Sequence, residues 1–577
     1  MSNSNVLIRG MVSAVASFIA TAGIISFYEP FYKFTMIIGV IVFCLFAVSI
    51  FLITNKYDQF EIFKVSHNVW SLLFVLVFPI LIIISTAPDQ SHIETTIMQI
   101  VTYLITYFVY VGLLLGLMEI IFRLNVHGSS LKFSFLIYFM IPVVGWALYL
   151  IAFYPGTMTP DSLAQWGQAH SYEWNNWHPI VHTWLLTALL QIWDSPAIIS
   201  SFQIIMMALI WAYSMKSIEK KGVSFLALAL FSVVAAAWPV LGIFSITLWK
   251  DILYSFVLFL FCVLIFNMVF TRGLWLDKKR NLILLLITSL AVVFFRHNGF
   301  PVFLVTGVFL FIVFRKQWKP LLLNFIAIIG IYLIVTGPVF SAFNVEPTEL
   351  KEALGIPTQQ IANIVENGDM TQEQKEYISE VMPLEIWKKY YHPYKVDPLK
   401  FSGEYDDVYI SETFGTFLKV WSGMVIQNPG LALEAFLRET SVVWQMHEPK
   451  DPGYTSKYVT NIYLNNEYGL ENKVIDEKLT KDMREYLEDS QENFLTTIWR
   501  PASYLLTILF LTFTAVMKHG KSSSIWLIAL PVLLNVGSVA ASLPAQEFRY
   551  LFSNVPLALF LIAVMWIGRD DKRVLYE

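Results

Sequence analysis

Long apolar runs, separated by short polar segments, dominate the chain. A run of about 20 apolar residues is long enough to cross the hydrocarbon core of a bilayer as an α-helix. The pattern therefore predicts an all-α polytopic membrane protein with about 14 transmembrane helices. The candidate spans lie near residues 7–27, 35–54, 69–87, 97–122, 132–153, 198–215, 223–241, 250–270, 281–296, 301–314, 320–339, 498–517, 524–542 and 551–568.

The composition narrows the class of protein. Of the 577 residues, 56% are hydrophobic and only 14% are charged, and the mean hydropathy is +0.60. This excludes a soluble enzyme and a disordered chain. A net charge of −4 offers no basic surface for a nucleic acid, so no nucleic-acid partner is expected. Cys44 and Cys262 both lie inside apolar runs and are expected to be small core residues.

Positive charge is distributed unevenly between the two sets of short loops. When the spans are threaded alternately, one set holds 20 Lys and Arg, and the other holds five: Lys33, Lys250, Arg296, Arg500 and Arg549. Cytoplasmic loops carry the excess of Lys and Arg. We therefore expect a multi-pass cell-membrane protein with both termini in the cytoplasm and a large extracytoplasmic domain.

The spans and loops suggest four parts. The predicted organisation is an accessory transmembrane module of about four helices (1–130), a transmembrane core with an outer loop at 154–197 (131–339), a mostly helical extracytoplasmic domain (340–497), and C-terminal transmembrane helices with a short cytoplasmic tail (498–577).

The outer loop carries two residues of chemical interest. Asp161 follows the point where a span ends, and His178 precedes Pro179 where the chain turns back to the membrane. The loop is rich in Trp, which favours short helices at the membrane–water interface. Asp161 also suits a helix N-cap, and His178 an interface histidine next to a turn, so both structural interpretations stay open.

Ionisable residues lie at the outer ends of three further apolar runs: Lys250 and Asp251, Arg296 and His297, and Glu547 and Arg549. Such residues are costly at span ends unless they are paired or used. Together, Lys250, Arg296 and His297 could hold a phosphate with Arg549, whose guanidinium gives a forked contact. The alternative is that these are paired or snorkelling interface residues. Asp251 cannot pair well with its helical neighbour Lys250, and is a second candidate acid or metal ligand.

These features resemble the GT-C superfamily of integral-membrane glycosyltransferases, which use polyprenyl-phosphate-linked sugars. The resemblance rests on Asp161, on His178-Pro179-Ile180, and on Glu547-Phe548-Arg549-Tyr550 followed by Pro556, and it covers about residues 132–568. The sequence lacks the adjacent Asp-Glu pair and the second proline of some GT-C branches. It is also similar to a bacterial family of multi-span proteins of unknown function grouped near GT-C.

The resemblance implies a GT-C-like core and an inverting glycosyl transfer to a cell-envelope glycan, glycolipid or protein, with membrane lipids around the chain. Asp161 would be the general base, and a carboxylate near the apolar interface should have a raised pKa. Cations would stabilise the leaving phosphate. No metal-ligand spacing is visible, although Mg²⁺ or Mn²⁺ is compatible with this chemistry. The candidate substrate-binding residues are His178, Asp251, Glu547, Tyr550, Gln359 and Gln360.

Two other classes of function stay open. A transporter or flippase of a lipid-linked saccharide would show repeated halves and charges at the membrane midplane, whereas here the charges lie at the outer ends. A sensor or assembly scaffold would tolerate replacement of Asp161. Gln359 and Gln360 are open to a structural interpretation as well, as residues packed within the outer domain.

Overall fold

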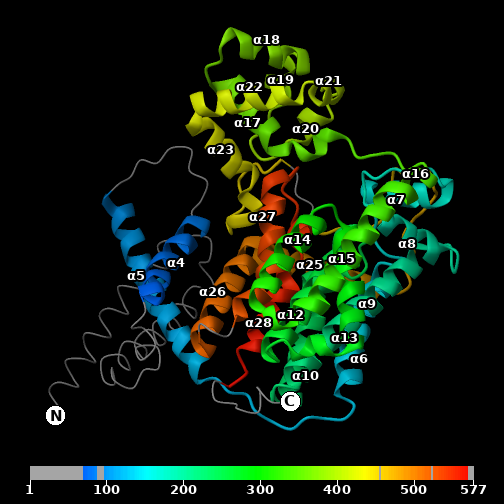
Figure 1. The fold of residues 1–577 in the computed structure, drawn as a ribbon, viewed down its shortest axis with the longest axis vertical. Helices are drawn as coiled ribbons and strands as arrows, with labels where there is room; N and C mark the ends of the chain where they lie inside the picture. Colours follow the sequence, from blue (N-terminus) through cyan, green and yellow to red (C-terminus); the bar gives the residue numbers. More distant parts are fainter. Residues whose placement is uncertain (1–68, 87–96, 454–456, 521–523, 569–577) are drawn as a thin grey trace.

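The structure is a computed structural model that describes residues 69–86, 97–453, 457–520 and 524–568. Within these ranges the chain is all-α, with isolated β-bridges and no sheet (Figure 1). The predicted spans at 7–27 and 35–54, Cys44 and the predicted positions of both chain ends fall outside the described residues.

Six described helices are long and apolar enough to cross a membrane, and all six fall on predicted spans. They are Tyr103–Arg123, Ser134–Ala152, Pro196–Glu219, Lys250–Phe270, Arg315–Ala342 and Pro501–His519. Shorter apolar helices accompany them at Leu73–Thr86, Ile180–Leu190, Phe225–Ala237, Gly299–Val313, Leu530–Ser542 and Phe548–Val564. The chain is therefore a multi-pass, all-α membrane protein.

These helices form one bundle. Its members are α4 (Val69–Thr86), α5 (Ile97–Arg123), α6 (Ser134–Ala152), α9 (Pro196–Glu219), α10 (Phe225–Ala237), α11 (Pro239–Phe244), α12 (Lys250–Phe270), α13 (Lys279–Phe295), α14 (Gly299–Val313), α15 (Trp318–Ile334), α26 (Pro501–His519), α27 (Leu530–Ser542) and α28 (Asn554–Val564). The short helix η9 (Phe548–Leu551) directly precedes α28.

Helix α12 is the centre of the bundle. It packs against α9, α13, α27 and α28, and nearly all of its side chains are buried, including Cys262. A helix that is apolar on every side is stable only where protein or lipid surrounds it. The N-terminus of α12 carries Lys250 and Asp251, so the most buried of the six described long apolar helices positions two candidate site residues.

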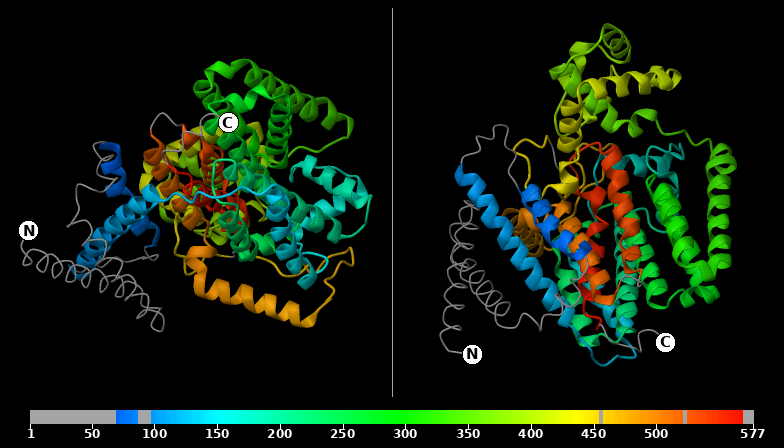
Figure 2. Two further views of the ribbon diagram at one scale, coloured as in Figure 1. Left: turned by 90° about the horizontal axis from the view of Figure 1, so that it is seen from below. Right: turned by 60° about the vertical axis from the view of Figure 1, so that its left-hand side comes forward.

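A helical head rises above one end of the bundle (Figures 1 and 2). It consists of α17 (Gly355–Asn367), α18 (Gln372–Val381), α19 (Leu384–Tyr390), α20 (Asp397–Lys400), α21 (Asp407–Glu412), α22 (Phe414–Gln427) and α23 (Pro429–Glu439). It has a hydrophobic core of its own, which includes Ile361, Ile378, Trp387, Leu399, Ile410, Phe417 and Met424.

The chain returns from the head to the bundle through α24 (Ser441–Trp444) and the long polar helix α25 (Glu477–Ile498). Helix α25 lies against the ends of α6 and α10: Thr480 Oγ1 donates to Ala152 O at 2.8 Å, and Tyr486 OH donates to Ala237 O at 2.6 Å. Its amphipathic sequence gives it one face for these contacts and one face for water.

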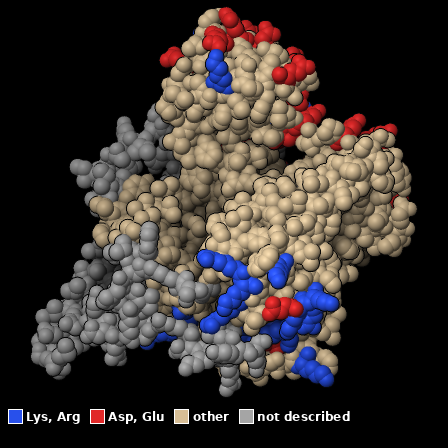
Figure 3. Space-filling view, in the orientation of Figure 1, with Lys and Arg blue, Asp and Glu red and all other residues tan. Residues whose placement is uncertain are grey.

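Charge is segregated along the molecule. In the view of Figure 3, Asp and Glu gather on the head, and Lys and Arg gather at the opposite end of the bundle. The sequence assigns the loops with Lys278, Lys279, Arg280 and Lys316 to the cytoplasmic set. The head and the basic loops therefore lie at opposite ends of the bundle.

Candidate functional site

Asp161 lies in the first turn of α7 (Pro160–Ser171), in the outer loop that follows α6. Proline at the first helical position starts this helix, and Thr159 is the N-cap residue. The backbone N–H of Thr159 donates to Ser162 Oγ at 3.3 Å, and its hydroxyl accepts from Trp249 Nε1 at 2.7 Å. Asp161 is thus not the N-cap, and capping the helix does not occupy its carboxylate.

The segment before α7 is tied to the segment before α12. Thr157 N donates to Ile246 O at 3.0 Å, and Leu248 N donates to Thr157 O at 3.0 Å. Gly156 makes this close approach possible: its φ is +124°, and a Cβ there would lie 2.3 Å from Ser200 Oγ. These contacts bring Asp161 next to the N-terminus of α12.

Asn472, from the segment before α25, holds the same loop. Its amide donates to the carbonyl oxygens of Phe153 and Gly156, both at 3.0 Å, and its Oδ1 accepts from Ile462 N at 2.6 Å. A single side chain therefore satisfies backbone groups of two segments that the sequence places more than 300 residues apart.

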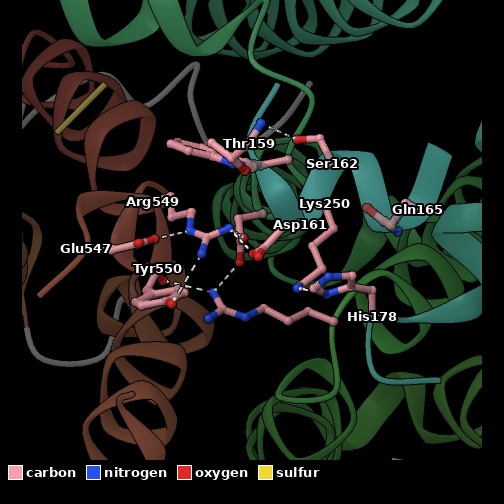
Figure 4. Close-up of polar contacts among 12 residues, drawn as sticks. Thr159, Asp161, Ser162, Gln165, His178, Lys250, Glu547, Arg549 and Tyr550 are labelled. Atoms are coloured by element: carbon pink, nitrogen blue, oxygen red, sulfur yellow. Dashed lines mark hydrogen bonds and ion pairs between the residues drawn. The ribbon is translucent and has the colours of Figure 1, made fainter. Parts of the chain in front are cut away.

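Arg549 is the centre of the site (Figure 4). Its Nη1 donates to Asp161 Oδ2 at 2.5 Å, and its Nε donates to Glu547. The guanidinium also lies 4.9 Å from the ring centroid of Trp249 and 5.0 Å from that of Tyr550. Cation–π contacts and ion pairs thus fix the plane of this side chain.

A second ion pair lies deeper. Arg296 Nη1 is 3.1 Å from Asp251 Oδ1, and it also donates to Tyr550 O at 3.0 Å. Asp251 is fully buried, and its Oδ2 lies 3.8 Å from Arg549 Nη1. The two arginines, which come from the end of α13 and from η9, therefore converge on the acid at the start of α12.

Lys250 and Asp251 point to different partners, as adjacent helical residues must. Lys250 Nζ lies 2.5 Å from His178 Nδ1 (Figure 4). Burial, and then the charge of Lys250, lower the pKa of His178 to about 3, so its imidazole is neutral at pH 7. Lysine is a donor, so Nδ1 accepts and Nε2 carries the proton. His178 Nε2 is buried and has no hydrogen-bond partner among the residues that the structure describes.

His297 lies at the edge of this cluster. Its Nε2 is 3.0 Å from Asn176 O, which also accepts from Thr348 Oγ1 at 2.6 Å. Burial, followed by the charge of Lys250, lowers the pKa of His297. His297 thus positions the backbone next to His178 and is neutral at pH 7.

The site gathers three carboxylates and three cations: Asp161, Asp251, Glu547, Lys250, Arg296 and Arg549. Their charges balance when all six are ionised. Burial opposes ionisation of Asp161, but Arg549 and then Lys250 outweigh it and hold the pKa of Asp161 below its ordinary value. The raised pKa expected from the sequence is wrong, because the sequence did not reveal this arginine contact. Burial raises the pKa of Glu547 against the effect of Arg549.

Gln359 and Gln360 do not join this cluster. Both lie in α17 of the head, where Gln359 Nε2 donates to His392 O at 2.5 Å and Gln360 Nε2 donates to Ala432 O at 3.1 Å. Gln360 Oε1 also accepts from Trp421 Nε1 at 2.9 Å. Their contacts are internal to the head, so the structural interpretation applies to both.

Sequence reasoning missed the residues that orient the charged groups. Trp249 directly precedes Lys250 and could have been noticed as an aromatic neighbour, but nothing in the sequence connects it to Thr159 or Arg549. Asn472 lies in a polar stretch with no distinguishing pattern. Among the described residues, no group of three or more His, Cys, Asp or Glu is placed to hold a metal ion.

Comparison with known proteins gives one match. Residues 165–576 fit the model of the DUF6020 family, a family of unknown function, and this region contains every residue of the cluster except Asp161. No curated protein and no solved structure matches the chain significantly. Because the family model covers more than half of its length, the chain belongs to the DUF6020 family.

Proposed function

We propose that this protein is a membrane glycosyltransferase of the GT-C type. It transfers a sugar from a polyprenyl-phosphate-linked donor to a cell-envelope acceptor on the outer face of the membrane, with Asp161 as the general base. The proposal includes about 14 transmembrane helices and a GT-C-like core. One observation supports it most strongly: the partly exposed carboxylate of Asp161 pairs with Arg549, in a cluster that also contains Lys250 and Arg296.

The reaction needs few groups. The acceptor hydroxyl oxygen forms a bond to the anomeric carbon of the donor sugar while the bond from that carbon to the phosphate oxygen breaks. Asp161 takes the hydroxyl proton, and the polyprenyl phosphate leaves with the bonding electrons. Arg549 and Lys250 stabilise the charge that develops on the phosphate. Attack from the face opposite the phosphate inverts the anomeric centre.

The contact between Asp161 and Arg549 gives the base a means of activation. In the structure described here, Arg549 stabilises the ionised carboxylate, which makes Asp161 a weak base. A donor phosphate that pairs with Arg549 competes for the same guanidinium. Asp161 then loses part of its stabilising charge, and its basicity rises when the donor is in place.

The distribution of charge supports the orientation. The basic loops lie at the end of the bundle opposite the head (Figure 3), and Lys and Arg are enriched in cytoplasmic loops. We place the head and the charged cluster on the outer side, and both termini in the cytoplasm. Lipid-linked donors would then reach the cluster from the outer leaflet.

The proposal is tested with purified full-length protein in nanodiscs. Wild type, Asp161→Asn and a control, Asp194→Asn, are given a panel of polyprenyl-phosphate sugars with candidate acceptors, and sugar transfer or release is followed by mass spectrometry. Asp194 lies in the same outer loop, is mostly exposed and pairs with His170. Wild type and the control should turn over, and Asp161→Asn should not.

Two outcomes contradict the proposal. A fully active Asp161→Asn protein removes the base from the mechanism. No turnover in any protein, together with equal binding of the lipid-linked sugar by wild type and Asp161→Asn, favours a transporter or flippase instead.

A further inference from the structure

An exposed tryptophan lies next to the charged cluster. The rings of Trp177 and His178 stack, with centroids 4.6 Å apart and an angle of 22° between their planes. Nδ1 of the same histidine contacts Lys250, a member of the charged cluster. Trp177 nevertheless remains 40% exposed. A large aromatic surface that stays open beside a buried polar site is a common feature of ligand pockets.

The head contributes a second exposed ring. Phe401, directly after α20, lies 6.4 Å from Trp177 between centroids, with an angle of 66° between the rings, and is 54% exposed. The two rings come from the outer loop of the bundle and from the head. The pair therefore lies where these two parts of the chain meet.

A role as a membrane-interface anchor does not account for Trp177. Trp184, from the same outer loop, packs against Phe340 and Phe343 in the segment that follows α15. That contact is with the end of a membrane-spanning helix. Trp177 instead contacts Phe401 of the head, so its ring lies at the junction between the outer loop and the head.

The backbone holds the tryptophan in place. Trp177 N donates to Asn175 Oδ1 at 3.2 Å, and the carbonyl of the preceding residue, Asn176, accepts from both His297 and Thr348. A ring on a backbone fixed in this way loses little conformational freedom when a ligand binds.

The polar groups around the two rings favour a neutral ligand. Lys351 lies 5.6 Å from the Phe401 ring, but it is paired with Glu349 at 2.6 Å. Lys400, 5.5 Å from the same ring, is paired with Glu352 at 2.7 Å. A phosphate would find no unpaired cation among these, whereas a sugar can place its C–H face on an aromatic ring and its hydroxyls toward polar groups.

His178 supplies an independent sign of a ligand. Its Nε2 is a buried donor that no other group in the described part of the chain accepts from, and such a donor is costly unless a ligand accepts its hydrogen bond. A sugar hydroxyl or ring oxygen is a suitable acceptor. We propose that Trp177, Phe401 and His178 Nε2 form a saccharide subsite that binds the sugar of the acceptor next to Asp161. The inference rests on the proposed function, which requires a sugar to lie beside Asp161.

The test is saturation-transfer NMR on full-length protein in nanodiscs, with methyl glycosides of glucose, galactose, mannose and their N-acetylamino forms as probes. Wild type, Trp177→Ala and Phe401→Ala are compared with Trp193→Ala, a control tryptophan of the same loop that is 48% exposed. We expect saturation of sugar C–H protons in wild type and the control. Trp177→Ala should weaken binding up to about tenfold, and Phe401→Ala less.

Binding that is equal in Trp177→Ala and wild type overturns the subsite, and so does the absence of binding by every probe. Decyl phosphate is titrated in parallel to separate this failure from failure of the proposed function. If decyl phosphate binds in wild type and binds more weakly in Arg549→Gln, but no saccharide binds, the saccharide inference fails and the charged donor site remains. If neither probe binds, both proposals fail.

Discussion

Replacing Asp161 by Asn should have opposite effects on binding and on catalysis. Asp161 and a donor phosphate compete for Arg549, because Asp161 Oδ2 already occupies the guanidinium nitrogen Nη1 at 2.5 Å. Asparagine keeps the shape of the side chain and removes its charge. The variant should therefore bind a phosphate monoester more tightly than wild type, although it lacks the proposed base.

The size of the effect follows from the geometry. Two unit charges about 4 Å apart interact by about 4 kcal/mol at an effective dielectric constant of about 20, and by about 1 kcal/mol in water. The side chain of Asp161 is 28% exposed, and the amide of Asn still makes a hydrogen bond to Arg549, so the net gain lies near the lower value. A gain of about 1.4 kcal/mol corresponds to about tenfold tighter binding.

The assay is titration of decyl phosphate into full-length protein in nanodiscs, followed by calorimetry at pH 7.5. Wild type, Asp161→Asn and the exposed control Asp194→Asn are measured at the same salt concentration, because ionic strength screens exposed charges. Asp161→Asn should bind about tenfold more tightly than both. Weaker binding by Asp161→Asn would refute the competition and would make Asp161 part of the phosphate site.

Three further predictions concern stability. Arg549→Gln leaves three carboxylates with two cations and should destabilise the fold by about 3–5 kcal/mol. Adding Glu547→Gln removes one of these carboxylates and should restore part of the lost stability. Equal melting temperatures for the single and double variants would contradict this prediction. Because the pKa of His178 is about 3 and that of an unfolded histidine about 6.5, the unfolded chain binds the proton first as the pH falls. Protonation of His178 in the unfolded chain should therefore lower the free energy of unfolding by about 2 kcal/mol as the pH falls from 6.5 to 5. In His178→Gln the melting temperature should depend less on pH over this range, and an unchanged slope would contradict the assigned role of His178. Asn472→Ala should destabilise the fold by about 1–3 kcal/mol and expose the loop at Gly156 to proteolysis, and a wild-type melting temperature and cleavage pattern would argue against it.

The sequence predicts the positions of the described apolar helices well because the signal for each is local. A run such as 250–270 is apolar on every side, and α12 spans Lys250–Phe270. The span expected near 301–314 is short, and α14 runs over Gly299–Val313. In both cases the helix is surrounded by lipid or by other apolar helices, so its own residues form an apolar run that can be recognised in a single stretch of sequence.

The site is predictable only in part, since its contacts join distant segments. The sequence indicates that Asp161 and Arg549 lie on the same side of the membrane, but not that they touch across 388 residues. For this reason the direction of the Asp161 pKa shift could not be inferred. The same reason applies to Asn472, whose role depends entirely on where the chain folds back against Gly156.

The cluster divides into a fixed pair and an exchangeable pair, and the proposed reaction needs both. Asp251 is fully buried, and its ion pair with Arg296 ties α12 to α13; Arg296 is also held by a backbone carbonyl, so a ligand cannot displace this pair cheaply. Asp161 is partly exposed and is held by a single arginine nitrogen. Asp161 contacts Arg549, the cation that we propose stabilises the leaving phosphate. Asp161 can therefore act as a base only if the two side chains separate during the reaction cycle. We therefore assign phosphate recognition to Arg549 and Lys250, and to Arg296 the positioning of Asp251.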